Sequence, residues 1–246
     1  LSSTPTLDAL IGESVCLTQQ YTASPVCNPS RAALLTGRYP HRTGSIDTLE
    51  GRGLDRLARR EVTLADAFHR AGYATGHVGK WHLGAFAPEY HPNRRGFDEF
   101  TGFRGGWSDY YRWRLERNGR PMPADGRYLT DVFTQSAVDF IERHRAQPFF
   151  LHLCYNAPHT PPQAPLDEIR PFVEAGRVSF PVAVMYGMIR RLDRGVEQVL
   201  DTLRRMGLEE NTVVVFSRDN GPQFVSELGP IPRFNCHFNG RKGTTY

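Results

Sequence analysis

The sequence has 246 residues, of which 39% are hydrophobic and 23% charged, so it has the composition of a folded chain with a sizeable core. Its formal net charge of +4, from 30 basic and 26 acidic side chains, is too small for a histone-like nucleic-acid binder and suits an anionic substrate. No apolar run approaches the ~20 residues that cross a bilayer, and the four widely spread cysteines exclude a disulfide framework.

The first predicted element is a short helix that starts at Pro29 and stops at Gly37. Pro29 biases Asn28 away from the α region and suits the first helical position, so Asn28 is the predicted N-cap. Gly37 is the expected left-handed stop. Cys27 then lies just outside the positive end of the helix, where unpaired N–H groups favour an anion and lower the pKa of a nearby thiol.

Arg31 lies in the first turn of this helix, where its positive charge opposes the helix dipole. The placement makes sense if Arg31 binds an anion, either the substrate or a modified form of Cys27. The local pattern leaves a structural alternative open, in which Cys27 is a buried structural cysteine and Arg31 extends to solvent.

Helices and strands alternate along the rest of the sequence. Thr63 is a capping residue and Gly72 a stop, while the other elements follow from helical spacing or from continuous apolar runs. The predicted helices cover residues 63–71, 130–144 and 184–207, and the predicted strands are YATGHV (73–78), PFFLHLCY (148–155) and TVVVFS (212–217). This alternation predicts an α/β fold, with a mainly parallel sheet sandwiched by helices, in a single domain over residues 1–246.

Three polar clusters follow the predicted strands: GKWHLG (79–84), NAPHTPP (156–162) and RDNG (218–221). Ligands of open α/β sheets bind beyond the carboxyl ends of the strands. The three clusters therefore predict one site.

Lys80 and His82 are two residues apart, so an extended segment would direct both side chains to one side. There they could hold an anion and transfer a proton to a leaving group. Prolines on both sides of His159 stiffen its loop and fix the direction of the ring. Each of these two motifs has a structural alternative when it is considered alone. Lys80 could be a surface lysine and His82 a loop histidine that caps a carbonyl, and His159 could be a solvent-exposed histidine.

Asp219 and Asn220 offer two hard oxygen ligands for Ca²⁺ or Mg²⁺, unless they only form an Asx turn with Gly221. Lys242 lies in a basic loop, RKGTTY, that could meet a sulfate or phosphate group or remain solvated.

Five motifs occur in the order seen in sulfatases, namely CNPSRAALLTGRYPHRTG, GYATGHVGKWHLG, PHTP, VVVFSRDNGP and RKGTTY. The first resembles the sulfatase signature C-x-P-S-R followed by L-T-G-R. The resemblance runs along the whole sequence and implies a formylglycine-dependent, arylsulfatase-like hydrolase of the alkaline-phosphatase-like superfamily. It also implies a secreted, periplasmic or lysosomal compartment, which the residues themselves leave unknown because the sequence has neither an initiating Met nor a charged leader.

The resemblance implies that a separate formylglycine-generating enzyme oxidises Cys27 to formylglycine, whose hydrate attacks an aryl or sugar sulfate ester. Arg31 then steadies the hydrate, two lysines and His159 hold sulfate oxygens, and His82 assists proton transfer. The implied catalytic residues are Cys27, Arg31, Lys80, His82, His159 and Lys242. Neither a nucleic acid nor a membrane is expected as a partner.

By the same resemblance, Asp219, Asn220 and the oxygen derived from Cys27 bind a metal ion, normally Ca²⁺ with Mg²⁺ as the alternative. Sulfatases also resemble one another in an initial strand that ends in adjacent aspartates, whereas this sequence contains no Asp-Asp pair. Three ligands are too few for a cation that prefers about 6–8 oxygens. The sequence also ends just after the lysine motif. By the resemblance it is therefore either a fragment of a longer protein or a natural truncation with a compromised site, and the loss of a central strand is expected to expose sheet edges.

Two other functions stay open. One is a phosphonate or phosphate ester hydrolase of the same superfamily. The other is a non-catalytic relic that binds sulfated glycans, suggested by GFRGGWSDYYRWRLERNGR (102–120), where arginines alternate with aromatic side chains. This segment is otherwise a basic insertion that packs its aromatic side chains on the domain, and any role in binding would be substrate selection at the mouth of the site.

Overall fold

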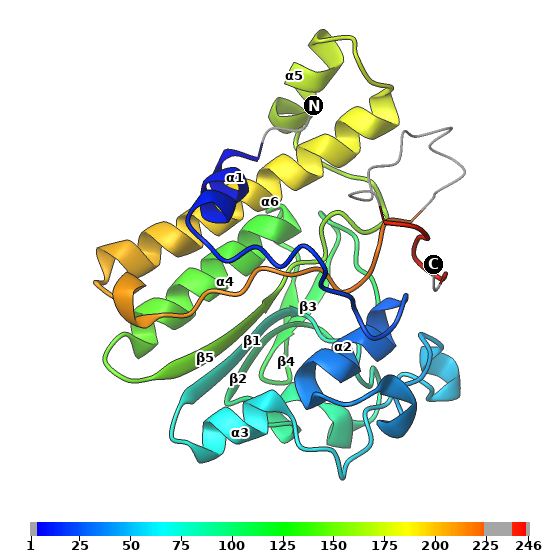
Figure 1. Ribbon diagram of the computed structural model, residues 1–246, viewed down its shortest axis with the longest axis vertical. Helices are drawn as coiled ribbons and strands as arrows, with labels where there is room; N and C mark the ends of the chain where they lie inside the picture. The colour runs from blue at the N-terminus through cyan, green and yellow to red at the C-terminus, as the bar shows by residue number, and fades with distance from the viewer. Residues whose placement is uncertain (1–3, 224–237, 245–246) are drawn as a thin grey trace.

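Helices cover both faces of one open five-stranded sheet (Figure 1). The computed structural model describes residues 4–223 and 238–244. The strands are β1 (Ala74–Lys80), β2 (Glu99–Phe103), β3 (Arg114–Arg117), β4 (Arg120–Pro123) and β5 (Phe149–Cys154). The α-helices are α1 (Pro5–Gly12), α2 (Cys27–Thr36), α3 (Leu64–Arg70), α4 (Leu129–His144), α5 (Leu166–Glu174) and α6 (Phe180–Arg205). Short 3₁₀ helices are η1 (Pro40–Arg42), η2 (Glu50–Arg52), η3 (Pro88–Tyr90), η4 (Pro92–Arg94) and η5 (Glu209–Asn211).

The strands lie in the order β4-β3-β2-β1-β5. β1 pairs in parallel with both β2 and β5, so the centre of the sheet has the expected parallel arrangement. β3 and β4 form an antiparallel hairpin that extends the sheet from β2. The α/β fold is confirmed. The sheet is nevertheless mixed, because part of the arginine- and aromatic-rich segment forms the hairpin.

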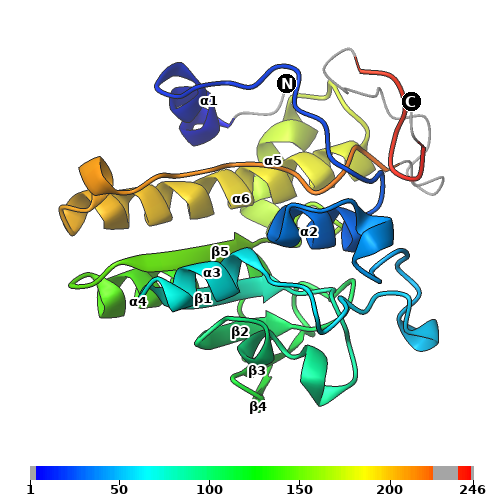
Figure 2. The ribbon, with the colours of Figure 1, turned by 60° about the horizontal axis from the view of Figure 1, so that its bottom comes forward.

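The two faces of the sheet are covered by different helices (Figure 2). α4 packs directly on β1, where Gly76 leaves room for the ring of Phe140; a Cβ at Gly76 would lie 2.5 Å from it. α6 packs in turn on α4. α2 and α3 lie on the opposite face, where Leu35 packs in a buried cluster with Trp81 and Phe100. This layering leaves the carboxyl ends of the parallel strands free beside the start of α2.

The predicted helices and their ends are largely confirmed. Thr63 accepts a hydrogen bond from the backbone N–H of Asp66, whose side chain bonds back to Thr63, in a reciprocal capping box. Gly37 ends α2 in the left-handed conformation, with φ of 65°. The prediction that Asn28 caps α2 is wrong, because the N-cap is Val26 and Cys27 is the first helical residue.

The Asn28 side chain is turned inward instead of capping the helix. Its amide nitrogen donates to the carbonyl of Asp55 at 2.9 Å and to that of His82, and its amide oxygen accepts from Ser45 Oγ at 2.6 Å. Bonding these buried groups avoids the free-energy cost of leaving them unpaired. The long-range partners therefore decide the conformation of Asn28, rather than the local capping preference.

The prediction of a buried strand over residues 212–217 is also wrong. This segment follows η5 without ladder pairing, and the exposed fractions of Val213 and Val215 are 91% and 83%. A strand needs a neighbouring strand for its backbone hydrogen bonds. β5 is the terminal strand of the sheet, and within the described residues nothing pairs with its outer edge.

In the described part of the chain, no helix is both long enough and apolar enough to cross a membrane.

Candidate active site

Cys27 and Arg31 are one helical turn apart at the start of α2, and both are buried, with exposed fractions of 4% and 6%. The Arg31 guanidinium donates from Nε to the carbonyl of Trp81 at 3.0 Å and from Nη2 to that of Lys80. Its Nη1 lies 3.7 Å from Asp219 Oδ2. Burial alone would lower the pKa of Arg31, but Cys154 and Asp219 raise it above the ordinary value, so Arg31 remains charged. This charged side chain ties α2 to the end of β1.

Lys80 and His82 are buried at the end of β1, with exposed fractions of 3% and 2%. Burial lowers the pKa of Lys80, while the nearby Cys27 and Asp219 oppose that shift. The pKa of His82 falls to about 2 because of its burial and the positive charges of Lys80 and Arg31, so the ring is neutral. His82 has φ of 57°, which interrupts the extended backbone. Strand alternation is therefore not what places these two side chains.

His159 and Lys242 meet from segments 83 residues apart, with 3.5 Å between Lys242 Nζ and His159 Nε2. The other ring nitrogen, Nδ1, lies 2.9 Å from the carbonyl oxygen of Thr160. That oxygen can only accept, so this contact assigns the proton of the neutral ring to Nδ1 and leaves Nε2 facing Lys242. Burial, Lys80 and Lys242 lower the pKa of His159. Its loop is held further by the Tyr110 hydroxyl, which donates to the His159 carbonyl at 3.0 Å.

Asp219 and Asn220 lie where the chain returns toward α2 after residues 212–217. The Asp219 side chain is 32% exposed and faces Arg31. Asn220 Oδ1 is buried and has no hydrogen-bond partner among the described residues, while its amide nitrogen donates to the Gly221 carbonyl at 2.9 Å. A carboxylate beside an unpaired amide oxygen fits the ligand type that Ca²⁺ and Mg²⁺ prefer. Two side chains nevertheless supply only part of such a coordination sphere.

The predicted site residues influence one another electrostatically. The pKa of Lys80 depends on Cys27, Arg31, Asp219 and Lys242, and that of His82 depends also on His159. Figures 1 and 2 show the end of the orange segment and the red C-terminal segment meeting near α2. Backbone bonds from Gly243 to Pro25 and from Lys242 to Pro222, at 3.0 and 2.9 Å, join these segments.

Lysine occurs in this chain only at two of the predicted site positions. Lys80 and Lys242 are its two lysines, and the other 28 basic residues among the 30 are arginines. A compact ammonium group with three donors differs from a planar guanidinium in how it can hold an oxyanion. This compositional bias is a signal in the sequence that points to both positions without any motif.

Sequence reasoning missed two further side chains at the site. Glu50 Oε1 lies 3.6 Å from His82 Nε2 and accepts a hydrogen bond from the Gly106 backbone, and burial raises the pKa of Glu50. Asn156 is joined to the site by its carbonyl, which accepts from the His159 backbone N–H at 2.8 Å. It is 5% exposed, and among the described residues neither polar atom of its amide has a partner. Asn156 could have been found from its place two residues after β5, whereas no sequence signal marks Glu50.

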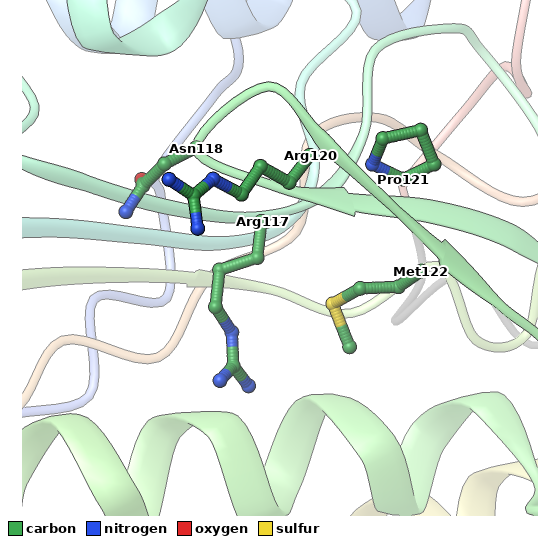
Figure 3. A pocket seen from close by; sticks show the side chains of 5 residues that line it. All are labelled: Arg117, Asn118, Arg120, Pro121 and Met122. Carbon is green, nitrogen blue, oxygen red and sulfur yellow. The ribbon is translucent and has the colours of Figure 1, made fainter.

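A surface hollow lies at the β3–β4 hairpin (Figure 3). It has a volume of about 510 Å³ and is lined by Arg117, Asn118, Arg120, Pro121 and Met122. None of the predicted catalytic or metal-binding residues lines this hollow.

Comparison with known proteins identifies the family. The sulfatase family model matches residues 1–245. The chain is 35% identical over 270 residues to the uncharacterized sulfatase YdeN of Escherichia coli (strain K12), covering 99% of this chain and 47% of that protein. It is 35% identical to N-acetylgalactosamine-6-sulfatase of Canis lupus familiaris, covering 91% and 46% of the two chains. The chain thus spans about half the length of the curated relatives it matches.

Solved structures agree with this assignment. Ps i-CgsB superposes with a TM-score of 0.78 and 34% identity, covering 83% of this chain and 50% of that one, and it has also been solved in complex with k-i-k-neocarrahexaose. The signature at Cys27, the α/β fold and the match along nearly every residue point to one conclusion: the chain belongs to the sulfatase family.

Proposed function

We propose that this protein hydrolyses sulfate esters at the site formed by Cys27 and the cations around it. The observation that carries the proposal is the gathering of Arg31 and both lysines of the chain around a buried Cys27. Three cations focused on one position suit an anionic group, and membership of the sulfatase family favours a sulfate ester.

Position 27 is proposed to carry formylglycine, made from Cys27 by a formylglycine-generating enzyme. Formylglycine would supply a geminal diol at this position. One of its hydroxyl groups would serve as the nucleophile that displaces the alcohol from sulfur, and the other would allow sulfate to be released without a second attack on sulfur. Arg31, one turn along α2 and fixed by two backbone carbonyls, is placed to orient the modified side chain. Its charge stabilises negative charge that develops there.

The other side chains hold the sulfate group and move protons. Lys80 and Lys242 neutralise the charge that grows on the sulfate oxygens as the ester bond breaks. His82 is neutral, so a ring nitrogen can accept a hydrogen bond from a hydroxyl at position 27, and this is how the side chain is proposed to assist proton transfer there. His159 can donate to a sulfate oxygen only when Nε2 is protonated, and a bound anion raises its pKa toward that state.

Asp219 and Asn220 would hold a divalent cation, Ca²⁺ in the first instance and Mg²⁺ as the alternative, together with an oxygen at position 27. When bound, such a cation would supply positive charge that polarises the sulfate oxygens. The buried, unpaired Asn220 Oδ1 supports this assignment.

The proposed substrate class is a sulfated sugar. N-acetylgalactosamine-6-sulfatase is named for a sugar sulfate, and the Ps i-CgsB structure holds a carrageenan oligosaccharide. Trp107, 66% exposed, follows Gly106, whose backbone bonds to Glu50. A Cβ on Gly106 would lie 2.8 Å from His82 Nε2, which puts Trp107 at the edge of the site. An exposed indole there can stack on a sugar ring.

Replacing Trp107 by Ala is expected to raise KM for a sulfated oligosaccharide about 10-fold, because the stacking surface worth about 1–2 kcal/mol is lost. Hydrolysis of a small aryl sulfate should change little. Steady-state kinetics with both substrates checks this, and Phe180→Ala, which removes an equally exposed aromatic ring at the start of α6, is the matched control. Equal effects on both substrates would contradict a role in sugar binding.

The decisive experiment combines mass spectrometry and kinetics. The chain is produced in a host that has the maturing enzyme, and the Cys27 peptide is analysed for formylglycine while aryl sulfate hydrolysis is measured. We expect both the modification and sulfate release. An unmodified thiol would overturn the formylglycine mechanism. A modified protein without hydrolysis would favour the glycan-binding relic, and preference for a phosphate over a sulfate ester in direct competition would favour the phosphatase alternative.

Lys242 allows a test that does not depend on turnover. Inorganic sulfate should protect this half-buried lysine from an amine-acylating reagent, because a bound anion covers its ammonium group. Peptide mass spectrometry measures the extent of acylation, and the α-amine of the chain is the internal reference. Chloride at equal ionic strength is the control; equal protection by both salts would show general screening instead of a site.

A further inference from the structure

A cluster of three potential metal ligands lies beneath the active site, on the face of the sheet that α2 and α3 cover. His77 of β1 is paired in register with His152 of β5, and Cys154 is two residues further along β5. His77 Nδ1 lies 3.2 Å from His152 Nδ1, and His152 Nε2 lies 3.2 Å from Cys154 Sγ. One donor atom from each residue falls within 4.8 Å of the others. We call this set the His77–His152–Cys154 cluster.

His77 is held in the orientation of a metal ligand. Its Nε2 lies 3.0 Å from the carbonyl of Lys80, which can only accept a hydrogen bond. The proton of the neutral ring is therefore on Nε2, and the Nδ1 lone pair faces the cluster. A backbone carbonyl behind a histidine is the usual support of metal-binding imidazoles. Trp81 and Phe97 pack edge-on against the ring, with centroids 5.2 Å away, and Phe100 lies beside it.

Cys154 is prepared to act as a thiolate. The side chain is 7% exposed, and although burial disfavours the charged form, His152 and Arg31 lower its pKa to about 7. Neither His77 nor Cys154 has a role in the proposed reaction. Two imidazoles and one thiolate, buried together among aromatic rings, form a donor set with softer ligands than the oxygens of Asp219 and Asn220.

We propose that the His77–His152–Cys154 cluster binds a thiophilic transition-metal cation, Zn²⁺ or Cu⁺. Sulfur and imidazole ligands select these ions over Ca²⁺ and Mg²⁺. Binding replaces the proton of the Cys154 thiol, which is released to solvent. Three ligands complete a trigonal Cu⁺ site, whereas Zn²⁺ would take a fourth ligand from water. Arg31 is positively charged and lies beside the thiolate, so it repels a metal complex that carries a net positive charge. Cu⁺ bound to one thiolate and two neutral imidazoles has no net charge, whereas Zn²⁺ with the same ligands has a charge of +1, and Arg31 therefore favours Cu⁺.

The cluster does not include Cys27, so it can be tested in a variant that lacks the other thiols. In a chain with Cys16, Cys27 and Cys236 replaced by Ser, Cys154 is the sole cysteine. Co²⁺ is the probe for a Zn²⁺-type site, because thiolate ligation gives an intense ultraviolet charge-transfer band. We expect one equivalent of Co²⁺ to produce this band, and Zn²⁺ or Cu⁺ to abolish it in competition. The stronger competitor identifies the preferred ion.

Two substitutions test the ligands. Cys154→Ser should remove the band, and His77→Gln should weaken metal affinity at least about 10-fold. His69→Gln, which changes a histidine with a 57% exposed side chain on α3, is the matched control and should change nothing. Circular dichroism verifies the fold of each variant, and His152→Gln replaces His77→Gln if the latter does not fold. Absence of the Co²⁺ band together with failure of the same chain to bind one equivalent of Cu⁺, or a band that survives Cys154→Ser, overturns the proposal.

Discussion

Replacing Arg31 by Met is expected to lower kcat/KM for an aryl sulfate at least about 10³-fold. Removing a single preorganised donor costs about 10²–10³. Arg31 does more than donate, because its guanidinium also fixes the carbonyls of Trp81 and Lys80 and faces Asp219. Without it, position 27 loses its nearest positive charge in α2, and the ends of α2 and β1 lose their connection. Displacements on the order of 1 Å at a reacting group cost a further ~10².

The stability of the Arg31 variant separates a catalytic effect from a structural one. The Trp81 carbonyl loses its side-chain donor, so the free energy of unfolding should fall by about 1–3 kcal/mol. Arg31→Lys keeps the charge but not the fork of donors, and should recover stability better than activity. Arg70→Met, which removes an exposed arginine from the last turn of α3, is the control for loss of charge. An Arg31→Met enzyme with nearly full activity would remove Arg31 from the proposed site.

Much of the fold could be predicted because its determinants are local. Thr63, together with Gly72, marks the region of α3, and apolar residues at helical spacing mark α4 and α6. The apolar runs of β1 and β5 are buried in the sheet or packed against helices. Because the carboxyl ends of parallel strands share one edge, the sequence also indicated that Lys80 and His159 would approach one another.

Features that depend on distant partners could not be predicted in this way. The apolar pattern of residues 212–217 suits a strand, but a pattern cannot specify whether a neighbouring strand is available. Asparagine is a common helix N-cap, yet the side chain of Asn28 forms its hydrogen bonds with Asp55, His82 and Ser45. Glu50 reaches His82 from a 3₁₀ turn. The His77–His152–Cys154 cluster exists only because β1 and β5 pair in one particular register.

The free energy of unfolding should fall steeply as the pH is lowered, and we assign a measurable part of this fall to His82. Its folded-state pKa of about 2 lies far below the ordinary value of 6.5, because the ring is buried and faces Lys80, Arg31 and His159. Glu50, 3.6 Å away, is the acidic group beside it. Below pH 6.5 the unfolded chain binds a proton at His82 that the folded chain excludes. Stability therefore rises with pH, and on acidification it is lost by about 1.4 kcal/mol per pH unit.

The test is the free energy of unfolding, measured by urea at several pH values from 7.5 to 5. His82→Gln should reduce the slope between pH 6 and 5 by about 1.4 kcal/mol per unit, since glutamine does not titrate. His77, whose pKa burial also lowers, continues to contribute a slope of the same sign in that variant. His41→Gln changes an exposed histidine and should leave the slope unaltered. If wild type and His82→Gln lose stability in parallel, the pKa of His82 is the same in the folded and unfolded chains. Burial and the positive charges of Lys80 and Arg31 would then not be what keeps the ring neutral.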